Sequence, residues 1–197
     1  MIELEKEDYI LIRDFLGNDL SAFDKLVFKY QHTVYNLCLR MLGQPDDAAD
    51  CAQETFIKVY KSLKCFEFKS TFTTWLYRIT VNTCKNKLAS AEYRRHKNFV
   101  LIDQPVNSED ESYYREIPDN SSSPAAVFEQ KMTETKIMEA IQSLPSGQKI
   151  LVILCDIEGR SYEEIAQITR LHLGTIKSRL ARARHTLRRK LEGVITG

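Results

Sequence analysis

Hydrophobic residues recur at helical spacing through most of the chain. The clearest stripe lies in residues 21–43 and comprises Phe23, Leu26, Val27, Tyr30, Val34, Leu37, Cys38 and Met41. Such a pattern predicts an amphipathic helix with one buried face, which Ser21 and Asp24 would open and Gly43 would close. Similar stripes predict helices over 4–16, from Pro45 to 63, over 71–90, over 124–144, up to Gly159, over 161–169 and from 174 to 191. The sequence therefore predicts an all-α protein.

The helix after Pro45 combines an apolar stripe with an acidic face. We expect its core stripe to be Ala49, Ala52, Phe56, Tyr60 and Leu63. Most of its polar residues would face outward, namely Asp46, Asp47, Asp50, Gln53 and Glu54. Acids in a first turn favour the helix dipole, which accounts for Asp46 and Asp47. Asp50 and Glu54 extend the acidic face further and suggest a basic protein partner.

The helix over 71–90 has two apolar faces. One consists of Phe72, Trp75, Leu76 and Ile79, and the other of Tyr77, Val81, Cys84 and Leu88. A helix covered on two sides is central to its bundle. The remaining stripe is polar and mainly basic, and it consists of Arg78, Asn82 and Lys85. Just before this helix, lysines interleave with aromatic residues over 58–72, a pattern that suits single-stranded nucleic acid, although each ring taken alone could equally belong to the core.

Residues 99–123 differ from the rest of the chain. Six acidic residues face a single basic one, and Pro105, Pro118 and residues 120–123 lack periodicity. We expect an acidic flexible linker there. It divides the chain into a helical domain over 1–98 and a second one over 124–197.

Residues 161–191 carry the strongest functional pattern. Ser161 and Glu164 form a capping box that starts a short helix, with Ile165, Ala166 and Ile168 expected to be buried. A longer helix follows, with an apolar stripe of Ile176, Leu180, Ala183, Leu187 and Leu191. Between Ile165 and Leu191 there are eight basic residues and no acid. Two such helices predict a helix-turn-helix whose longer helix enters a DNA major groove; an amphipathic surface helix, the alternative, usually interleaves acids.

Composition adds limits. The net charge of +1 conceals the local basic excess, and no apolar run is long enough to span a bilayer. The five cysteines include no CxxC pair, and the histidines show no ligand spacing with them. We expect reduced core thiols in a cytoplasmic protein, with no metal site and no cofactor.

Three segments together resemble a known family. They are DDAADCAQETFIKVY, FTTWLYRITVNTCKNKL, and LPSGQKILVILCDIEGRSYEEIAQI followed by GTIKSRLARAR. They resemble the bacterial sigma-70 family of RNA polymerase sigma factors, specifically its extracytoplasmic-function (ECF) group. The resemblance runs from about residue 8 to residue 192.

The resemblance implies a non-catalytic protein that binds core RNA polymerase, directs it to a promoter and helps to melt the DNA. It assigns Asp50, Gln53 and Glu54 to polymerase binding. The −10 element and its melting would involve Phe66, Phe68, Lys69, Ser70, Thr71, Arg78, Asn82 and Lys85. The −35 element would meet Thr175, Lys177, Ser178, Arg179, Arg182, Arg184 and Arg188. Of these, Lys177, Ser178 and Arg182 suit base contacts, and Arg179, Arg184 and Arg188 suit phosphates.

The resemblance also implies a regulator and some departures. An anti-sigma factor, often membrane-bound, would hold the free protein inactive at the inner face of the membrane; no small-molecule substrate is expected. Where the family usually has Gly or Asn in the helix-turn-helix turn, this chain has Arg170, so the turn is either strained in a left-handed conformation or built differently. His172 stands where a small residue or Pro is usual.

Two other functions are compatible with parts of the pattern. An ordinary helix-turn-helix regulator would bind a palindromic duplex without polymerase, but it would not need the first basic surface. An enzyme acting on nucleic acid would need clustered carboxylates or a metal facing a basic groove. The acids here lie on a helix face or in the linker instead.

Overall fold

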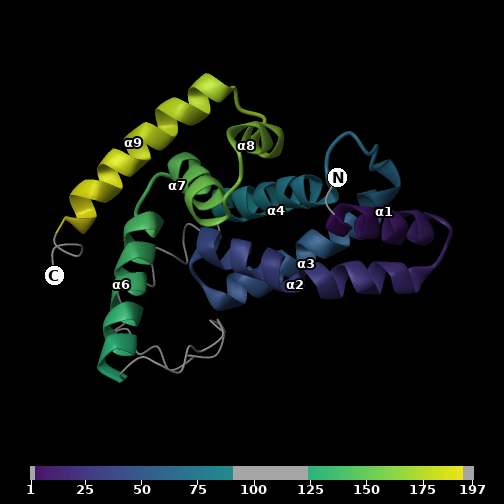
Figure 1. The fold of residues 1–197 in the computed structure, drawn as a ribbon, viewed down its shortest axis with the longest axis horizontal. Helices are drawn as coiled ribbons and strands as arrows, with labels where there is room; N and C mark the ends of the chain where they lie inside the picture. Colours follow the sequence, from purple (N-terminus) through teal and green to yellow (C-terminus); the bar gives the residue numbers. More distant parts are fainter. Residues whose placement is uncertain (1–2, 91–123, 193–197) are drawn as a thin grey trace.

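The computed structural model describes residues 3–90 and 124–192, which form helices joined by short loops (Figure 1). The N-terminal half contains α1 (Glu3–Leu16), α2 (Leu20–Leu42), α3 (Pro45–Ser62), the short 3-10 helix η1 (Leu63–Cys65) and α4 (Phe72–Ala89). The C-terminal half contains α6 (Pro124–Gln142), α7 (Ser146–Val152), η2 (Ile153–Ile157), α8 (Tyr162–Thr169) and α9 (Leu173–Leu191). The all-α prediction is confirmed, whereas the acidic linker predicted at 99–123 lies outside the described residues.

The helix ends follow local signals. Thr71 caps α4, its hydroxyl accepting a hydrogen bond from the Thr74 amide at 3.1 Å, and Gly43 ends α2 with a φ of 81°. One predicted start is wrong: α2 is capped by Asp19, whose carboxylate accepts from the Ser21 amide at 2.9 Å. Asp19 takes this role because it directly precedes the first helical residue, Leu20, and its carboxylate reaches the free amide of Ser21. The predicted single helix ending at Gly159 is divided, because its last turn is the π-helical η2.

The predicted core stripe of α3 is also wrong in part. Its buried residues are Ala48, Cys51, Ala52, Thr55 and Val59. Ala49 is exposed, and Tyr60 is 46% exposed, its ring lying against Phe15 and Phe23 at the surface. The stripe is rotated because α3 packs against both α2 and α4, and small side chains at 48, 51 and 55 let the three helices approach closely.

Helix α4 is the central helix of the N-terminal half, as predicted. Leu76, Tyr77, Val81 and Cys84 are at most 2% exposed, and Trp75 belongs to the core. α1 joins this bundle through buried Asp8, which accepts hydrogen bonds from Lys29 at 2.6 Å and Tyr30 at 2.5 Å.

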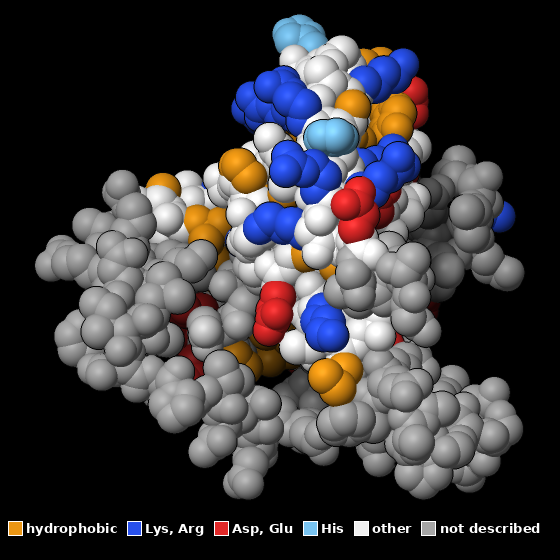
Figure 2. All heavy atoms as spheres, turned by 90° about the vertical axis from the view of Figure 1, so that its left-hand side faces the viewer, with side chains coloured by type: hydrophobic (Ala, Val, Ile, Leu, Met, Phe, Trp, Pro, Cys, Tyr) orange, Lys and Arg blue, Asp and Glu red, His pale blue; other side chains and the backbone are white. Residues whose placement is uncertain are grey.

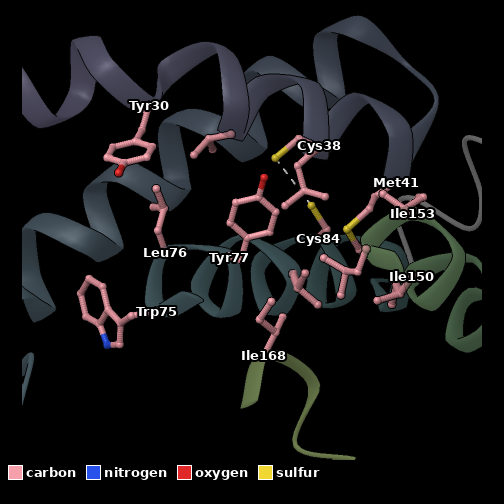
Figure 3. Close-up of a cluster of buried hydrophobic side chains, with 14 of the residues drawn as sticks. Tyr30, Cys38, Met41, Trp75, Leu76, Tyr77, Cys84, Ile150, Ile153 and Ile168 are labelled. Atoms are coloured by element: carbon pink, nitrogen blue, oxygen red, sulfur yellow. Dashed lines mark hydrogen bonds between the residues drawn. The ribbon is translucent and has the colours of Figure 1, made fainter. Parts of the chain in front are cut away.

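The two halves pack directly on each other. α8 lies against α4, and α6 and η2 lie against α2 (Figure 1). Figure 3 shows Tyr77 and Cys84 of α4 in one buried cluster with Cys38 and Met41 of α2 and with Ile150, Ile153 and Ile168 of the C-terminal half. One apolar core therefore extends through both halves of the described chain.

A polar network closes this contact around Glu158, which is 11% exposed at its side chain. Its carboxylate pairs with Arg40 of α2 and accepts the Tyr77 hydroxyl at 2.6 Å. The Arg160 guanidinium lies 4.3 Å from the centre of the Tyr77 ring. Gln142 donates to the Arg40 carbonyl at 2.6 Å. Glu158 lies 81 positions from Tyr77 and 118 positions from Arg40 in the sequence. This network was not identified from the sequence.

Candidate nucleic-acid interface

Helix α9 presents an exposed basic surface. The buried stripe of Ile176, Leu180 and Ala183 anchors it, so the opposite face is turned outward. The exposed polar side chains on that face include Lys177, Ser178, Arg182, His185, Arg188 and Arg189. We call Lys177, Ser178, Arg182 and Arg188 the α9 surface. Figure 2 shows lysine and arginine side chains gathered with histidines over the upper part of this side of the molecule.

The short helix α8 sets the position of α9. The predicted capping box is present: the Ser161 hydroxyl accepts from the Glu164 amide at 3.1 Å, and the Glu164 carboxylate accepts from the Ser161 amide at 2.9 Å. Arg170 ends α8 with a φ of 58°, in the left-handed region. Of the two forms open to this turn, the strained one is therefore present, at a cost of order 1–3 kcal/mol.

Some of the α9 residues predicted to contact DNA are engaged within the protein. Arg184 donates two hydrogen bonds to Asp156, at 3.2 and 2.5 Å, and this carboxylate raises the pKa of Arg184 above its ordinary value. Arg179 is half-buried, and its guanidinium lies close to Gly147. Thr175 is also half-buried, its carbonyl accepting the Ser178 hydroxyl at 3.1 Å. Arg184 thus holds α9 to η2, whereas Lys177, Arg182 and Arg188 are exposed.

The loop between α3 and α4 places its two phenylalanines differently. Phe66 is 5% exposed and packs against Trp75 with a ring-centre distance of 5.3 Å, which makes it a core residue in this conformation. Phe68 is 43% exposed, has a φ of 56°, and stacks on Tyr9 of α1 at 5.1 Å. Lys69 is exposed and pairs with Glu67 at 2.5 Å. A base could therefore reach Phe68 but not Phe66.

A cleft runs from this loop to the C-terminal half. The loop contributes Cys65, Phe66, Glu67, Lys69 and Ser70, α4 contributes Thr74, Trp75 and Arg78, and the other wall is Ala166, Gln167 and Arg170. Ser70 and Thr71 are half-buried beside it. The structure thus brings the loop and Arg78 together with the turn of the helix-turn-helix, which the sequence did not predict.

The remaining polar stripe of α4 is partly covered. We call Arg78, Asn82 and Lys85 the α4 surface; Asn82 is exposed, while Arg78 and Lys85 are half-buried. Burial lowers the pKa of Lys85, and the positive charge of Arg179 lowers it further. Two cations predicted to contact separate DNA elements therefore lie near each other in this conformation.

The acidic face of α3 is exposed, as predicted. Asp50 is 73% exposed at its side chain, Glu54 is 54% exposed, and Gln53 is exposed. Glu54 pairs with Lys58 at 2.7 Å, and Lys87 of α4 lies 3.6 Å from Asp50. At this exposure such ion pairs contribute little, so both carboxylates are available to a basic partner.

Family comparisons agree with this arrangement. Residues 26–96 match the family Sigma-70 region 2, and residues 134–187 match Sigma-70, region 4. The RNA polymerase sigma-H factor of Pseudomonas aeruginosa is 36% identical over 191 residues, covering 97% of each chain. The ECF RNA polymerase sigma-E factor of Escherichia coli K12 is 36% identical over 188 residues, covering 95% of this chain and 96% of that one. This chain belongs to the ECF group of the sigma-70 family.

Solved sigma factor structures share the fold. CnrH in complex with the cytosolic domain of CnrY superposes with a TM-score of 0.65 at 22% identity, covering 95% of this chain and 98% of that chain. The sigma factor RpoE from Bartonella quintana, in complex with the anti-sigma factor NepR, gives a TM-score of 0.61 at 24% identity, covering 88% and 98%. In this sigma factor, the region 2 match includes the α4 surface and the acidic face of α3, and the region 4 match includes Lys177, Ser178 and Arg182 of the α9 surface and ends one residue before Arg188. None of the helices described here is long and apolar enough to cross a membrane.

Proposed function

We propose that this chain is a sigma factor that binds core RNA polymerase, directs it to promoters with −35 and −10 elements, and helps to open the DNA. The observation that carries this proposal is the pair of basic surfaces on two helical units, in a chain that matches sigma-70 regions 2 and 4 in order. It acts without catalysing a reaction and works in the cytoplasm.

The α9 surface reads the −35 element as duplex DNA. Lys177 and Ser178 lie in the N-terminal part of α9, the part of a recognition helix that contacts base edges, and Arg182 lies one turn further along, at the middle of the helix. Arg188 and Arg179 meet phosphates, which position the helix without specifying sequence. Arg184 serves phosphate contact only if it leaves Asp156.

The loop and the α4 surface act on the −10 element. A flipped base stacks on Phe68, while Lys69, Ser70 and Thr71 line its path. Arg78, Asn82 and Lys85 contact the strand that is released. Phe66 contributes only if the loop rearranges, because it is buried here.

Promoter binding requires the two halves to separate. The −35 and −10 elements lie about 25 base pairs apart, which is roughly 85 Å of duplex at 3.4 Å per base pair. In the structure α8 rests on α4, and the cleft residues face each other. The described conformation is therefore a closed one, and polymerase binding through Asp50, Gln53 and Glu54 favours the open one.

An anti-sigma factor regulates this step. Two structures with the same fold, CnrH and RpoE, were solved with CnrY and the anti-sigma factor NepR respectively. We infer that an anti-sigma factor binds this chain and competes with the polymerase.

Run-off transcription tests the function. Purified core RNA polymerase is incubated with a library of random upstream sequences, with and without this protein. We expect initiation only with the protein, from sequences that share two spaced elements. If the polymerase ignores the protein while the protein binds a duplex palindrome alone, the chain is a helix-turn-helix regulator and not a sigma factor.

The polymerase contact is tested by charge reversal at Asp50. Asp50→Lys should weaken binding to core polymerase about tenfold, or about 1.4 kcal/mol, because it places a cation on the acidic face. Asp46→Lys is the matched control, since Asp46 is exposed in the first turn of the same helix. Equal losses in both variants, measured by titration of labelled protein with polymerase, would remove Asp50 from the contact.

A further inference from the structure

Three cysteine thiols meet inside the N-terminal half. They are Cys38 of α2, Cys51 of α3 and Cys84 of α4 (Figure 3 labels Cys38 and Cys84). The sulfur atoms of Cys51 and Cys84 lie 3.4 Å apart, those of Cys84 and Cys38 lie 3.6 Å apart, and all three are within 4.8 Å of one another. Each residue is at most 1% exposed. Within the described parts of the chain, no other set of His, Cys, Asp or Glu side chains converges in this way.

The triangle has the size of a thiolate coordination site. Three sulfurs bound to one centre with bonds of about 2.3 Å lie roughly 3.5–4.0 Å from each other, depending on whether the centre is pyramidal or planar. The helices hold the sulfurs near this spacing already, so binding would need little movement.

The surroundings supply no net charge, because the Lys58 ammonium, which donates to the Thr83 hydroxyl at 3.1 Å, is paired with the Glu54 carboxylate at 2.7 Å. The Thr55 hydroxyl donates to the Cys51 carbonyl at 2.8 Å, and the Thr83 hydroxyl donates to the Ile79 carbonyl at 3.0 Å. The three thiols lie in an interior that is otherwise largely apolar.

This buried environment favours a ligand whose complex with three thiolates carries no net charge. Three thiolates around a monovalent or divalent ion leave a net negative charge, and burying an uncompensated charge is costly. Three thiolates around a trivalent centre leave no net charge. We propose that Cys38, Cys51 and Cys84 form a binding site for trivalent arsenic, taken up as arsenous acid.

The uptake reaction balances without an oxidant or a reductant. Arsenous acid, As(OH)₃, reacts with three thiols, so that three As–O bonds break and three As–S bonds form. Each thiol proton leaves with a hydroxyl group as water, and three water molecules are released. Because the thiols are buried, the neutral acid enters through local opening of the helices, and uptake is slow.

The site lies behind the surfaces assigned above but does not depend on their function. Cys51 follows Asp50 in sequence, and Cys84 precedes Lys85. A bound centre would link α2, α3 and α4 covalently and stabilise their packing.

Native mass spectrometry of the reduced full-length protein with arsenite tests the proposal. We expect an adduct of one arsenic atom minus three hydrogens. Thermal unfolding should shift upward by about 5–10 °C when free arsenite is a hundredfold above its Kd. A melting temperature that falls with arsenite, or an adduct that keeps its thiol hydrogens, would overturn the site.

Cysteine variants locate the binding. Cys51→Ala and Cys84→Ala should each weaken arsenite uptake at least tenfold and abolish the thermal shift. Cys65→Ala is the matched control, because Cys65 is exposed and belongs to the same half. Arsenite uptake by Cys51→Ala that equals uptake by the wild type refutes the proposal. If the cluster variants fail to fold, the test rests on the wild-type protein and Cys65→Ala, which should show the same adduct mass and the same shift in melting temperature. Wild-type protein that binds zinc and no arsenic refutes the choice of a trivalent ligand.

Discussion

The α9 surface and the α4 surface share a chemistry but differ in access. Lys177, Arg182 and Arg188 of α9 are exposed. Arg78 and Lys85 of α4 are half-buried beside the C-terminal half. The comparison teaches that a basic helix stripe is accessible to a partner only where no other element covers it. Here the α4 surface is partly covered by the C-terminal half, which carries the α9 surface.

The contact that covers the α4 surface contains both apolar and polar residues. Ile153 and Ile168 are buried, yet Glu158, Arg40 and Tyr77 form an ionic and hydrogen-bonded network beside them. Interfaces between domains of one chain resemble transient protein interfaces and can open. Glu158 bonds to two residues of the N-terminal half. Changing Glu158 should therefore have the largest effect on how far the C-terminal half covers the α4 surface.

Replacing Glu158 should have the largest effect. Glu158→Ala removes the acceptor for Tyr77 and the partner of Arg40, and should weaken docking of the halves by about 2–4 kcal/mol. Hydrogen exchange should then accelerate in α4 and α8. Glu163→Ala, an exposed change on α8, should leave exchange unaltered; unchanged exchange in both variants would show that Glu158 does not hold the halves together.

The same contact should weaken at high pH. Burial and the hydrogen bond to Glu158 raise the pKa of Tyr77 to about 12. The folded chain thus binds the phenol proton more tightly than the unfolded chain, so this contribution is complete below about pH 10 and is lost as the pH rises through about 12. It amounts to roughly 2–3 kcal/mol.

Tyr77→Phe isolates this effect. Tyr30, whose pKa burial also raises to about 12, titrates in both proteins, so only their difference in unfolding free energy reports Tyr77. We expect this difference to narrow between pH 10 and 12 in denaturant titrations. If the difference in unfolding free energy stays constant over this range, the contribution of Tyr77 to stability comes from packing and not from its phenol proton.

On the exposed surface, Arg182 should govern sequence preference. Arg182→Ala should relax discrimination at one −35 position by about 1–3 kcal/mol, because a bidentate arginine contact to a base is lost. Transcription from a library randomised over the −35 element measures this. Equal losses on all sequences would move Arg182 to the phosphate contacts.

Arg188 should have the smallest and most uniform effect. Arg188→Ala should weaken binding on every promoter alike and reduce the slope of log affinity against log salt by about 1. Filter binding of the polymerase complex at several salt concentrations gives the slope. An altered consensus would contradict a phosphate role for this side chain.

Local patterns in the sequence were sufficient for much of the fold. The capping box of Ser161 and Glu164 and the Gly43 end were predictable because each is decided by residues within a turn of the helix. The buried stripe of α9 followed from its spacing, and its outward basic face followed from the stripe. The α9 surface could therefore be identified from the sequence, together with the exposed acids Asp50 and Glu54.

Tertiary packing decided the rest. The stripe of α3 turned toward Ala48 and Cys51 because two neighbouring helices, not one, set its buried face. Phe66 entered the core although its pattern also suited nucleic acid, since Trp75 and Phe72 lay within reach.

The Glu158 network and the three-cysteine cluster had no signal in the sequence. Their members come from separate helices, and no periodicity or short motif relates residues that are brought together only by the packing of those helices. By itself the sequence determined the helices, their exposed basic and acidic faces and the family. Only the tertiary structure decided that the two halves close on each other, because that contact depends on long-range complementarity of surfaces and charges.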